Sequence, residues 1–295
     1  MPKIKDFFRC AIKFHSRRKG KGGSVIAKAS YRAGERLYDE REDVFYDYTN
    51  KGGIVYTAIM LPENAPRNYQ SRQTLWNAVE WAEKRIDART AREVELGLPN
   101  ELNLKEHIQL VHEYVAANFT SQGMCADIAI HSGKHEHSQD SQHIEAENDT
   151  MISQENPHAH ILLTTRPVEP DGFADKKNRD WESPRNVYVW RKSWADVQNR
   201  AFERKGLDIK VEHESFKKRG IDRKPTIHEG HEVTALERRG VRTEVGNKNR
   251  AIRAENKARE QQREQKRQHQ WGSGADGFTI WERERVREYD GGRSR

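Results

Sequence analysis

The segment QENPHAHILLTT, residues 154–165, constrains the fold more strongly than any other stretch of this chain. It begins with a turn signal and continues with apolar residues at alternate positions, which is the pattern of a half-buried strand. The residues expected on the buried face are Ala159, Ile161 and Leu163. His158 and His160 then project from the opposite face, about 7 Å apart along the strand. Two imidazoles at this spacing can share one metal ion, so the sequence predicts a metal site on the open face of a sheet.

A third histidine ends another predicted strand. In MCADIAIH, residues 124–131, the alternation places His131 on the open face. The residues on the core face are Ala126, Ile128 and Ile130. Neutral imidazole suits divalent transition metals, and three of them with an open position describe a catalytic site better than a closed structural one. The alternative is that His158 and His160 only solvate an exposed sheet face.

Composition favours a polyanionic partner and argues against several classes of protein. The 295 residues carry a formal net charge of +7, and 34% of them are charged. Lysines and arginines that displace counterions gain affinity for a phosphate backbone. The two cysteines, Cys10 and Cys125, lie in apolar stretches, which argues against a disulfide scaffold. The sequence has neither an apolar run of membrane-spanning length nor a signal peptide, so we expect a cytoplasmic protein.

The chain is expected to form a globular front and a polar tail. Further strands are predicted at residues 6–15, 54–61 and 92–99, and helices at residues 25–39, 70–92, 108–119 and 190–201. Residues 132–155 show no periodicity and are interpreted as an exposed loop between neighbouring strands. Residues 213–231 are predicted to connect the front, residues 1–212, to a charged tail, residues 232–295, that is largely helical or disordered.

A candidate nucleophile lies on the first predicted helix. Tyr31 in AKASYRAGERLY follows the basic loop SRRKGKGG, so a phosphate backbone would meet cations around the phenol. The residues expected to bind DNA there are Arg17, Arg18, Lys19, Lys21, Lys28 and Arg32. A tyrosine oxygen that attacks phosphorus forms a phosphotyrosine ester, which conserves the energy of the broken phosphodiester. Tyr38, two turns further along the same predicted helix, is a second candidate. The alternative for Tyr31 is a half-buried tyrosine at the domain edge.

Seven motifs occur in order between about residues 8 and 230. They are GGSVIAKASYRAGERL, DYTNKGGIVYTAIMLPENAP, REVELGLPNEL, IAIH, ENPHAHILLTTR, WRKSWADVQNRAFERKG and RGIDRKPTIHEG. Together they resemble the MobA/MobL (MobQ-class) conjugative relaxases of mobilisable plasmids. The resemblance implies an HUH endonuclease fold of class α+β (α/β two-layer). Its central antiparallel sheet would have about five strands flanked by helices, with a charged helical extension at the C-terminus.

The resemblance also implies roles for individual residues. Tyr31 is the expected nucleophile. The expected metal ligands are His131, His158 and His160. Glu93 matches a family carboxylate near the site, whose role is either to orient a ligand histidine or to accept the tyrosine proton. Glu95 shares its face of the strand and is the second choice for that role.

The implied activity is metal-dependent, site- and strand-specific nicking of a plasmid transfer origin, followed by later rejoining of the strand. Mn²⁺ or Mg²⁺ is the favoured ion, with Zn²⁺, Ni²⁺ or Co²⁺ as alternatives. The implied partners are single-stranded origin-of-transfer DNA, relaxosome accessory proteins and a type IV coupling protein in a bacterial cytoplasm, with passage into a recipient cell left open. Competing hypotheses are a rolling-circle replication initiator or transposase with the same chemistry, and a non-catalytic DNA-binding module with a structural metal.

Overall fold

The computed structural model describes residues 3–5, 8–17, 23–133, 156–227 and 229–275. They fall into two compact units, Met1–His213 and Glu214–Arg295, which are considered separately below. The predicted limits of the front, connector and tail stay predictions. Among the described residues, no helix is both long enough and apolar enough to cross a membrane.

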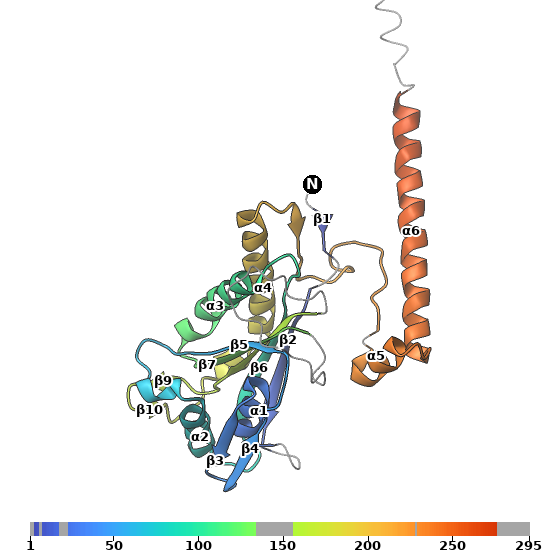
Figure 1. Ribbon diagram of the computed structural model, residues 1–295. Helices are drawn as coiled ribbons and strands as arrows, with labels where there is room; N and C mark the ends of the chain where they lie inside the picture. Colours follow the sequence, from blue (N-terminus) through green and yellow to red (C-terminus); the bar gives the residue numbers. More distant parts are fainter. Residues whose placement is uncertain (1–2, 6–7, 18–22, 134–155, 228, 276–295) are drawn as a thin grey trace, which may run out of the picture. The chain divides into compact units, whose positions relative to one another are not determined.

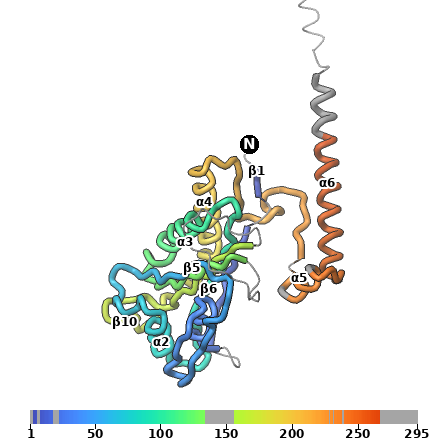
Figure 2. The backbone as a smooth tube through the Cα atoms, in the orientation of Figure 1, coloured from blue at the N-terminus to red at the C-terminus, as the bar shows by residue number. Residues whose placement is uncertain are grey.

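A five-stranded antiparallel sheet organises the first unit. Its strands are β2 (Cys10–Ser16), β5 (Ile54–Met60), β6 (Arg89–Gly97), β7 (Ala126–His131) and β8 (His158–Leu163). They lie in the order β2-β6-β8-β7-β5, and every neighbouring pair is antiparallel. This confirms the predicted α+β fold with five central strands. Figure 2 lets the reader follow the chain through the sheet from blue to yellow.

Two helices cover one face of this sheet and bury the main core (Figure 1). They are α3 (Leu104–Asn118) and α4 (Pro184–Arg204), and α3 begins with a capping box between Asn103 and Glu106. The strand residues that face them occupy alternate positions, as the sequence predicts: Val94, Leu96, Ala126, Ile128, Ile130, Ala159, Ile161 and Leu163. The predicted alternation is therefore confirmed on three strands.

The opposite face is also partly covered, so helices lie on both sides of the sheet. The helices α1 (Val25–Ala33) and α2 (Arg72–Ala82) bury a second, smaller core there. A buried ion pair fastens α2 to β7, because Arg72 Nε donates to Asp127 Oδ2 at 2.8 Å. Trp76 Nε1 donates to the same carboxylate oxygen at 2.8 Å. The face that alternation marks as open is thus a shielded surface at this point rather than a solvated one.

The first helix is shorter than predicted. Ser24 caps its N-terminus as expected, but α1 ends at Ala33 because Gly34 adopts a left-handed backbone with φ of 65°. The chain then forms β3 (Arg36–Asp39), paired with β4 (Val44–Asp47). Tyr38 therefore lies on a strand, with its hydroxyl donating to Asp43 Oδ1 at 2.5 Å. The placement of Tyr38 on the helical face of Tyr31 is wrong.

The second predicted helix, residues 70–92, is also too long. It ends at Ala82 in the structure, and the region from Arg89 onward belongs to β6. Glu83 follows the helix and accepts hydrogen bonds from distant residues, which directs the chain away from the helical path: Arg166 Nε lies 2.8 Å from Glu83 Oε1. No local pattern in the sequence predicts a contact between residues this far apart.

Shorter elements complete the first unit. They are β1 (Lys3–Ile4) with its parallel partner β11 (Ile209–Lys210), the pair β9 (Val168–Glu169) and β10 (Gly172–Phe173), and the 3-10 turns Arg67–Gln70, Thr120–Gln122 and Arg179–Glu182. Both cysteines are buried free thiols, as the sequence predicts.

The second unit contains two helices, α5 (Gly230–Arg238) and α6 (Glu244–Ala275). Side-chain amides of α6 hold the preceding chain: Asn249 pairs with the backbone of Ile227, and Asn256 pairs with the backbone of Lys224. These amides take the place of the apolar stripe that the sequence of α6 lacks. Residues 134–155 and 276–295, which include most of the predicted loop, lie outside the described residues.

Replacing Gly34 by alanine is expected to lower the free energy of unfolding of the first unit by about 1–3 kcal/mol. An alanine is strained at this φ, and its Cβ would lie 2.6 Å from Cδ1 of Ile54. Gly206→Ala is the matched control, because Gly206 has φ of 71° but no heavy atom within 4 Å of the added Cβ. Urea unfolding of the full chain, followed by tryptophan fluorescence, measures the decrease in the free energy of unfolding for both variants. An equal decrease in both would contradict a packing contribution at Gly34.

Candidate metal centre and active site

Three histidines meet at one end of the β7–β8 pair. His131 is the last residue of β7 and pairs directly with His158, the first residue of β8, while His160 pairs with Ala129. The three ring centroids are 5.0 to 5.2 Å apart. One ligand nitrogen from each ring lies within 4.8 Å of the other two. The antiparallel register thus brings together side chains from two segments that are 27 positions apart in sequence, counting from His131 to His158.

A protein oxygen anchors each imidazole through one ring nitrogen. His131 Nε2 lies 2.9 Å from the carbonyl oxygen of Arg32, and His158 Nδ1 lies 3.0 Å from that of Asn156. His160 Nδ1 lies 2.7 Å from Glu93 Oε1. If these nitrogens carry the proton and donate, the lone pairs of Nδ1 in His131 and of Nε2 in His158 and His160 remain for a metal ion.

The environment keeps imidazole neutral, which is the form that binds metals. Burial lowers the pKa of His131 to about 3, and the charges of His160 and Lys51 act in the same direction. Burial also lowers the pKa of His158. The three histidines can therefore bind a metal ion, because their donor type and spacing fit one.

Glu93 on β6 is the electrostatic centre of the cluster. Its side chain is buried, and it accepts hydrogen bonds at 2.7 Å from His15 Nε2, from His160 Nδ1 and from Arg32. Burial alone would raise the pKa of the carboxyl, but these donors hold it well below its usual range. The carboxylate is thus saturated with donors and holds one of the three histidines in place.

His15 is a site residue that the sequence analysis did not identify. Alternation on the first strand places it on the same face as Glu93, with which β2 is paired. The alternation of side chains along the strand was thus the one indication in the sequence that His15 could lie near the site. Nothing in the sequence indicated which carboxylate it would contact.

Glu95, the second choice for the carboxylate role, has a different environment. It accepts hydrogen bonds from Arg9 Nε at 2.8 Å and from Lys13 Nζ at 2.7 Å. These two partners are cations near the surface rather than histidines. The two carboxylates on the same face of β6 are therefore distinguished by their partners, and only Glu93 bonds to a member of the triad among the described residues.

Tyr31 lies on α1, next to the residue that ties this helix to the triad. Its ring is 39% exposed, the ammonium of Lys51 lies 3.6 Å from the ring centroid, and Tyr48 packs edge-on at 5.2 Å. The following residue, Arg32, contacts the triad twice, through its carbonyl to His131 and through its guanidinium to Glu93. The helix that carries the phenol is thereby joined to the histidine cluster.

The cations predicted to bind DNA have diverse surroundings. Arg17 is mostly buried, with Nε 2.6 Å from Glu80 Oε2, so it serves the fold. Lys28 is half-buried, and burial together with Arg32 lowers its pKa. Arg32 itself is bonded to Glu93. The remaining members of the predicted set lie outside the described residues: Arg18, Lys19 and Lys21.

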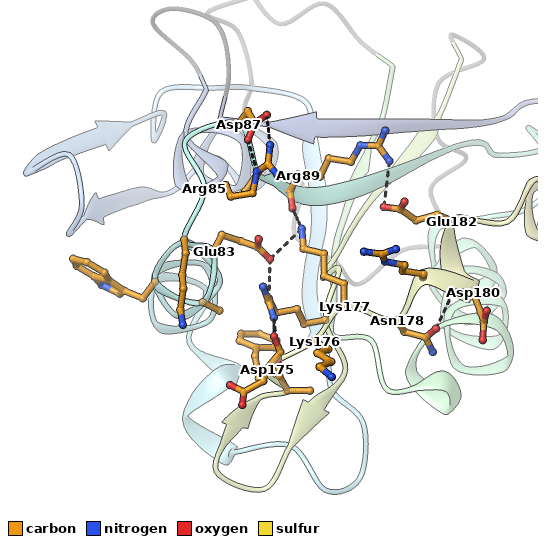
Figure 3. Close-up of a pocket in the computed structure, with 18 residues that line it drawn as sticks. Glu83, Arg85, Asp87, Arg89, Asp175, Lys176, Lys177, Asn178, Asp180 and Glu182 are labelled. Carbon is orange, nitrogen blue, oxygen red and sulfur yellow. Dashed lines mark hydrogen bonds and ion pairs between the residues drawn. The ribbon is translucent and has the colours of Figure 1, made fainter.

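A charged cleft of about 1220 Å³ lies at the other end of the sheet (Figure 3). Arg89 at the start of β6 and Arg166 beyond the end of β8 line it, whereas His158 pairs with Gly97 at the far end of β6. Glu83 accepts hydrogen bonds or ion pairs from Arg166 at 2.8 Å and Lys177 at 3.1 Å within it. The cleft is thus separate from the triad, and its cations are largely paired.

The family model described as the MobA/MobL family matches residues 23–239. This chain belongs to the MobA/MobL family. The resemblance found in the sequence motifs is confirmed.

Two relatives support the same assignment. The chain is 34% identical over 232 residues to "Mobilization protein MobL" of Acidithiobacillus ferridurans, covering 74% of this chain and 61% of the relative. It is 33% identical over 253 residues to "Probable conjugal transfer protein TraA" of Sinorhizobium fredii (strain NBRC 101917 / NGR234). This match covers 76% of this chain and 21% of the relative. The chain therefore spans less than two thirds of the length of these relatives.

A solved structure extends the similarity to three dimensions. It is described as "Molecular Basis of Vancomycin Resistance Transfer in Staphylococcus aureus" and shares 33% sequence identity with this chain. The TM-score is 0.58, and the match covers 70% of this chain and 98% of the other. The likeness thus includes nearly the whole of that protein's described chain.

Glu93→Gln is expected to weaken divalent metal binding by about 10- to 100-fold, because a neutral amide no longer orients His160 or raises its basicity. Glu95→Gln is the comparison variant and should weaken binding by less, because the side chain of Glu95 bonds to Arg9 and Lys13 and acts on His158 through its charge. Calorimetric titration with Mn²⁺, together with the visible spectrum of bound Co²⁺, reports the affinity and the ligand field. Equal effects of the two substitutions would contradict a special role for Glu93.

Proposed function

We propose that this protein is a DNA relaxase that nicks one strand of a plasmid transfer origin at a specific site and later rejoins it. Membership of the MobA/MobL family supports this proposal, as do the names of its relatives, which refer to mobilisation and conjugal transfer. The net charge of +7 suits a DNA substrate. The proposed substrate is single-stranded DNA of the origin region.

One observation carries the proposal: the residue after Tyr31 is bonded to the histidine cluster. Arg32 accepts a hydrogen bond from His131 through its backbone and donates to Glu93 through its side chain. A phenol on this helix and a cation held by the triad would therefore act on the same phosphate. A tyrosine on an unrelated part of the surface would have no such attachment.

The proposed reaction is a transesterification. The Tyr31 hydroxyl oxygen attacks the phosphorus of the scissile phosphodiester and forms a new P–O bond, while the bond to the 3′ oxygen breaks. The phenolic proton passes to solvent, and the leaving 3′ oxygen takes up a proton to become a free hydroxyl. The product is a 5′-phosphotyrosyl link between protein and DNA, and attack by a 3′ hydroxyl reverses the step and rejoins the strand.

The proposed ligands of the metal ion are His131, His158 and His160. A bound divalent cation would supply Lewis-acid polarisation of the phosphate and would offset its charge in the transition state. We propose Mn²⁺ or Mg²⁺ on the basis of the family chemistry, with Zn²⁺, Ni²⁺ or Co²⁺ as alternatives that imidazole ligands accept. The chain's own contribution is to orient the three rings through a hydrogen bond to each.

We assign Glu93 the orienting role rather than the role of general base. Its carboxylate is already bonded to His15, His160 and Arg32, and its pKa lies far below that of a group that would accept a phenolic proton near neutral pH. The same contacts hold α1, and with it Tyr31, against the sheet. Glu93 would thus couple the orientation of a ligand histidine to the position of the nucleophile.

The competing hypotheses differ in what the protein does to DNA. A replication initiator or transposase would form the same tyrosyl link, and the family match favours the relaxase over both. A non-catalytic binding module would form no link at all. Accessory relaxosome proteins and a type IV coupling protein remain proposed partners.

Tyr31→Phe is expected to abolish the covalent protein–DNA adduct while leaving oligonucleotide binding and metal content unchanged, because only the attacking oxygen is removed. Tyr38→Phe is the control, since that hydroxyl is bonded to Asp43 on the β3–β4 hairpin. Mass spectrometry of the adduct formed with a single-stranded origin oligonucleotide and Mn²⁺ identifies the linked residue. An undiminished adduct in Tyr31→Phe would place the nucleophile elsewhere, and no adduct in the wild type would favour the binding module.

Replacing Arg18, Lys19 and Lys21 together by glutamine is expected to weaken DNA binding and to flatten its salt dependence. For single strands the slope of log affinity against log salt should fall by about 0.7 for each lost phosphate contact. Arg17→Gln should instead lower the unfolding midpoint, because Glu80 would lose its ion pair. Fluorescence anisotropy at several salt concentrations measures the slope, and an unchanged slope would exclude the loop from the DNA contact.

A further inference from the structure

The ammonium of Lys51 lies over the ring of the proposed nucleophile, 3.6 Å from its centroid. We propose that Lys51 is the positioning cation of Tyr31: it holds the phenol ring in its attacking orientation and stabilises the negative charge that develops on the phenolic oxygen. This inference rests on the proposed function and assigns a residue to it that neither the motifs nor the metal site require.

The turn that carries Lys51 is bonded on both sides of the site. The backbone N–H of Lys51 donates to the carbonyl of Tyr48 at 2.9 Å. The N–H of Tyr48 in turn donates to the carbonyl of Glu35, just beyond α1, at 3.3 Å. At the other end, the N–H of Ser132 donates to the carbonyl of Gly53 at 2.8 Å. Ser132 directly follows His131. The turn is therefore fastened both to the end of the Tyr31 helix and to the strand end that presents a metal ligand.

Side-chain contacts place the Lys51 charge against the phenol ring. The ammonium lies 3.6 Å from the ring centroid of Tyr31, and the ring of Tyr48 packs edge-on against Tyr31 at 5.2 Å. A cation over one face and an aromatic edge beside it restrict the ring to one orientation. A ring that is 39% exposed would otherwise be free to rotate into solvent.

The charge of Lys51 also acts on the ionisation of the phenol, because the ammonium lies 3.6 Å from the centroid of the Tyr31 ring. An opposite charge within about 4–6 Å of an acid favours the ionised form of that acid. A phenol with an ordinary pKa of about 10 gains from such a partner at the moment when its oxygen attacks.

The kinetic test uses Lys51→Met, which keeps the length of the side chain and removes its charge. With saturating oligonucleotide and Mn²⁺, the rate of adduct formation is expected to fall by about 10²-fold, the scale of losing one preorganised charge in a transition state. The oligonucleotide Kd should change by less than about fivefold, the effect of one phosphate contact at 0.1 M salt. Lys51→Arg should recover most of the rate, because it restores the charge.

Two controls separate this role from general effects of charge or folding. Lys13→Met removes an equal charge on β2, where Lys13 is bonded to Glu95, and should leave the adduct rate within about fivefold of the wild type. The urea midpoint and the Co²⁺ spectrum of Lys51→Met should match those of the wild type. If Lys51→Met and Lys13→Met react equally fast, or if Lys51→Arg is as slow as Lys51→Met, the proposal is overturned.

A second measurement needs neither metal nor DNA. Tyrosine labelled with ¹³C at Cζ reports ionisation of each phenol, and the Tyr31 signal is identified by its loss in Tyr31→Phe. Tyr31 should ionise at a lower pH in the wild type than in Lys51→Met. The other charged and titratable groups around Tyr31 are the same in both proteins, so the difference between the titrations is assigned to Lys51. These groups are Lys28, Arg32, Glu35, Arg36, Tyr38, Asp39, Tyr46, Asp47, Tyr48, Tyr56, Arg72, Glu80, Glu93, Asp127 and His131. Identical titrations would overturn the proposal.

These measurements distinguish the two claims. If the wild type forms no adduct on Tyr31, the proposed function fails, and the phenol titration alone decides whether Lys51 is paired with Tyr31. If the adduct forms on Tyr31 but its rate does not depend on Lys51, the proposed function stands and the role of Lys51 is refuted.

Discussion

The buried carboxylate of Glu93 is the interaction on which the rest of the site depends. A carboxylate removed from water is stable only when its oxygens accept several donors, and here His15, Arg32 and His160 provide them from β2, α1 and β8. Each donor belongs to a different element, so satisfying one buried charge fixes the relative positions of three. The same bonds orient one of the triad histidines and hold the helix that carries Tyr31.

The chemistry of the site follows from this arrangement of charges. Burial lowers the pKa of His131 and of His158, while the carboxylate of Glu93 stays ionised because its donors outweigh its desolvation. The site thus favours neutral imidazole at these two ligands and an ionised carboxylate beside the third ligand, His160. In our proposal, Lys51 extends this separation of charge to the phenol.

The sequence predicted the parts of the site that depend on alternation along strands. The alternation of side chains along each strand predicted that His131, His158 and His160 lie on one face, and the antiparallel sheet brings them together. Helix lengths were less predictable, because the apolar periodicity continued through Gly34 while its left-handed backbone ended α1. Partners such as Arg72 and Asp127, or His15 and Glu93, lie 55 and 78 positions apart. Their pairing depends on strand order, which no local pattern encodes.

The histidines that begin and end the β7–β8 connection are paired within the sheet itself. His131 faces His158 across the ladder, and β8 is hydrogen-bonded on its other edge to β6, so the register has two independent supports. The geometry of the metal ligands therefore does not depend on the number of residues between these two strands. Because the entropic cost of closing a loop grows only slowly with its length, a longer connection between β7 and β8 should lower the free energy of unfolding only slightly.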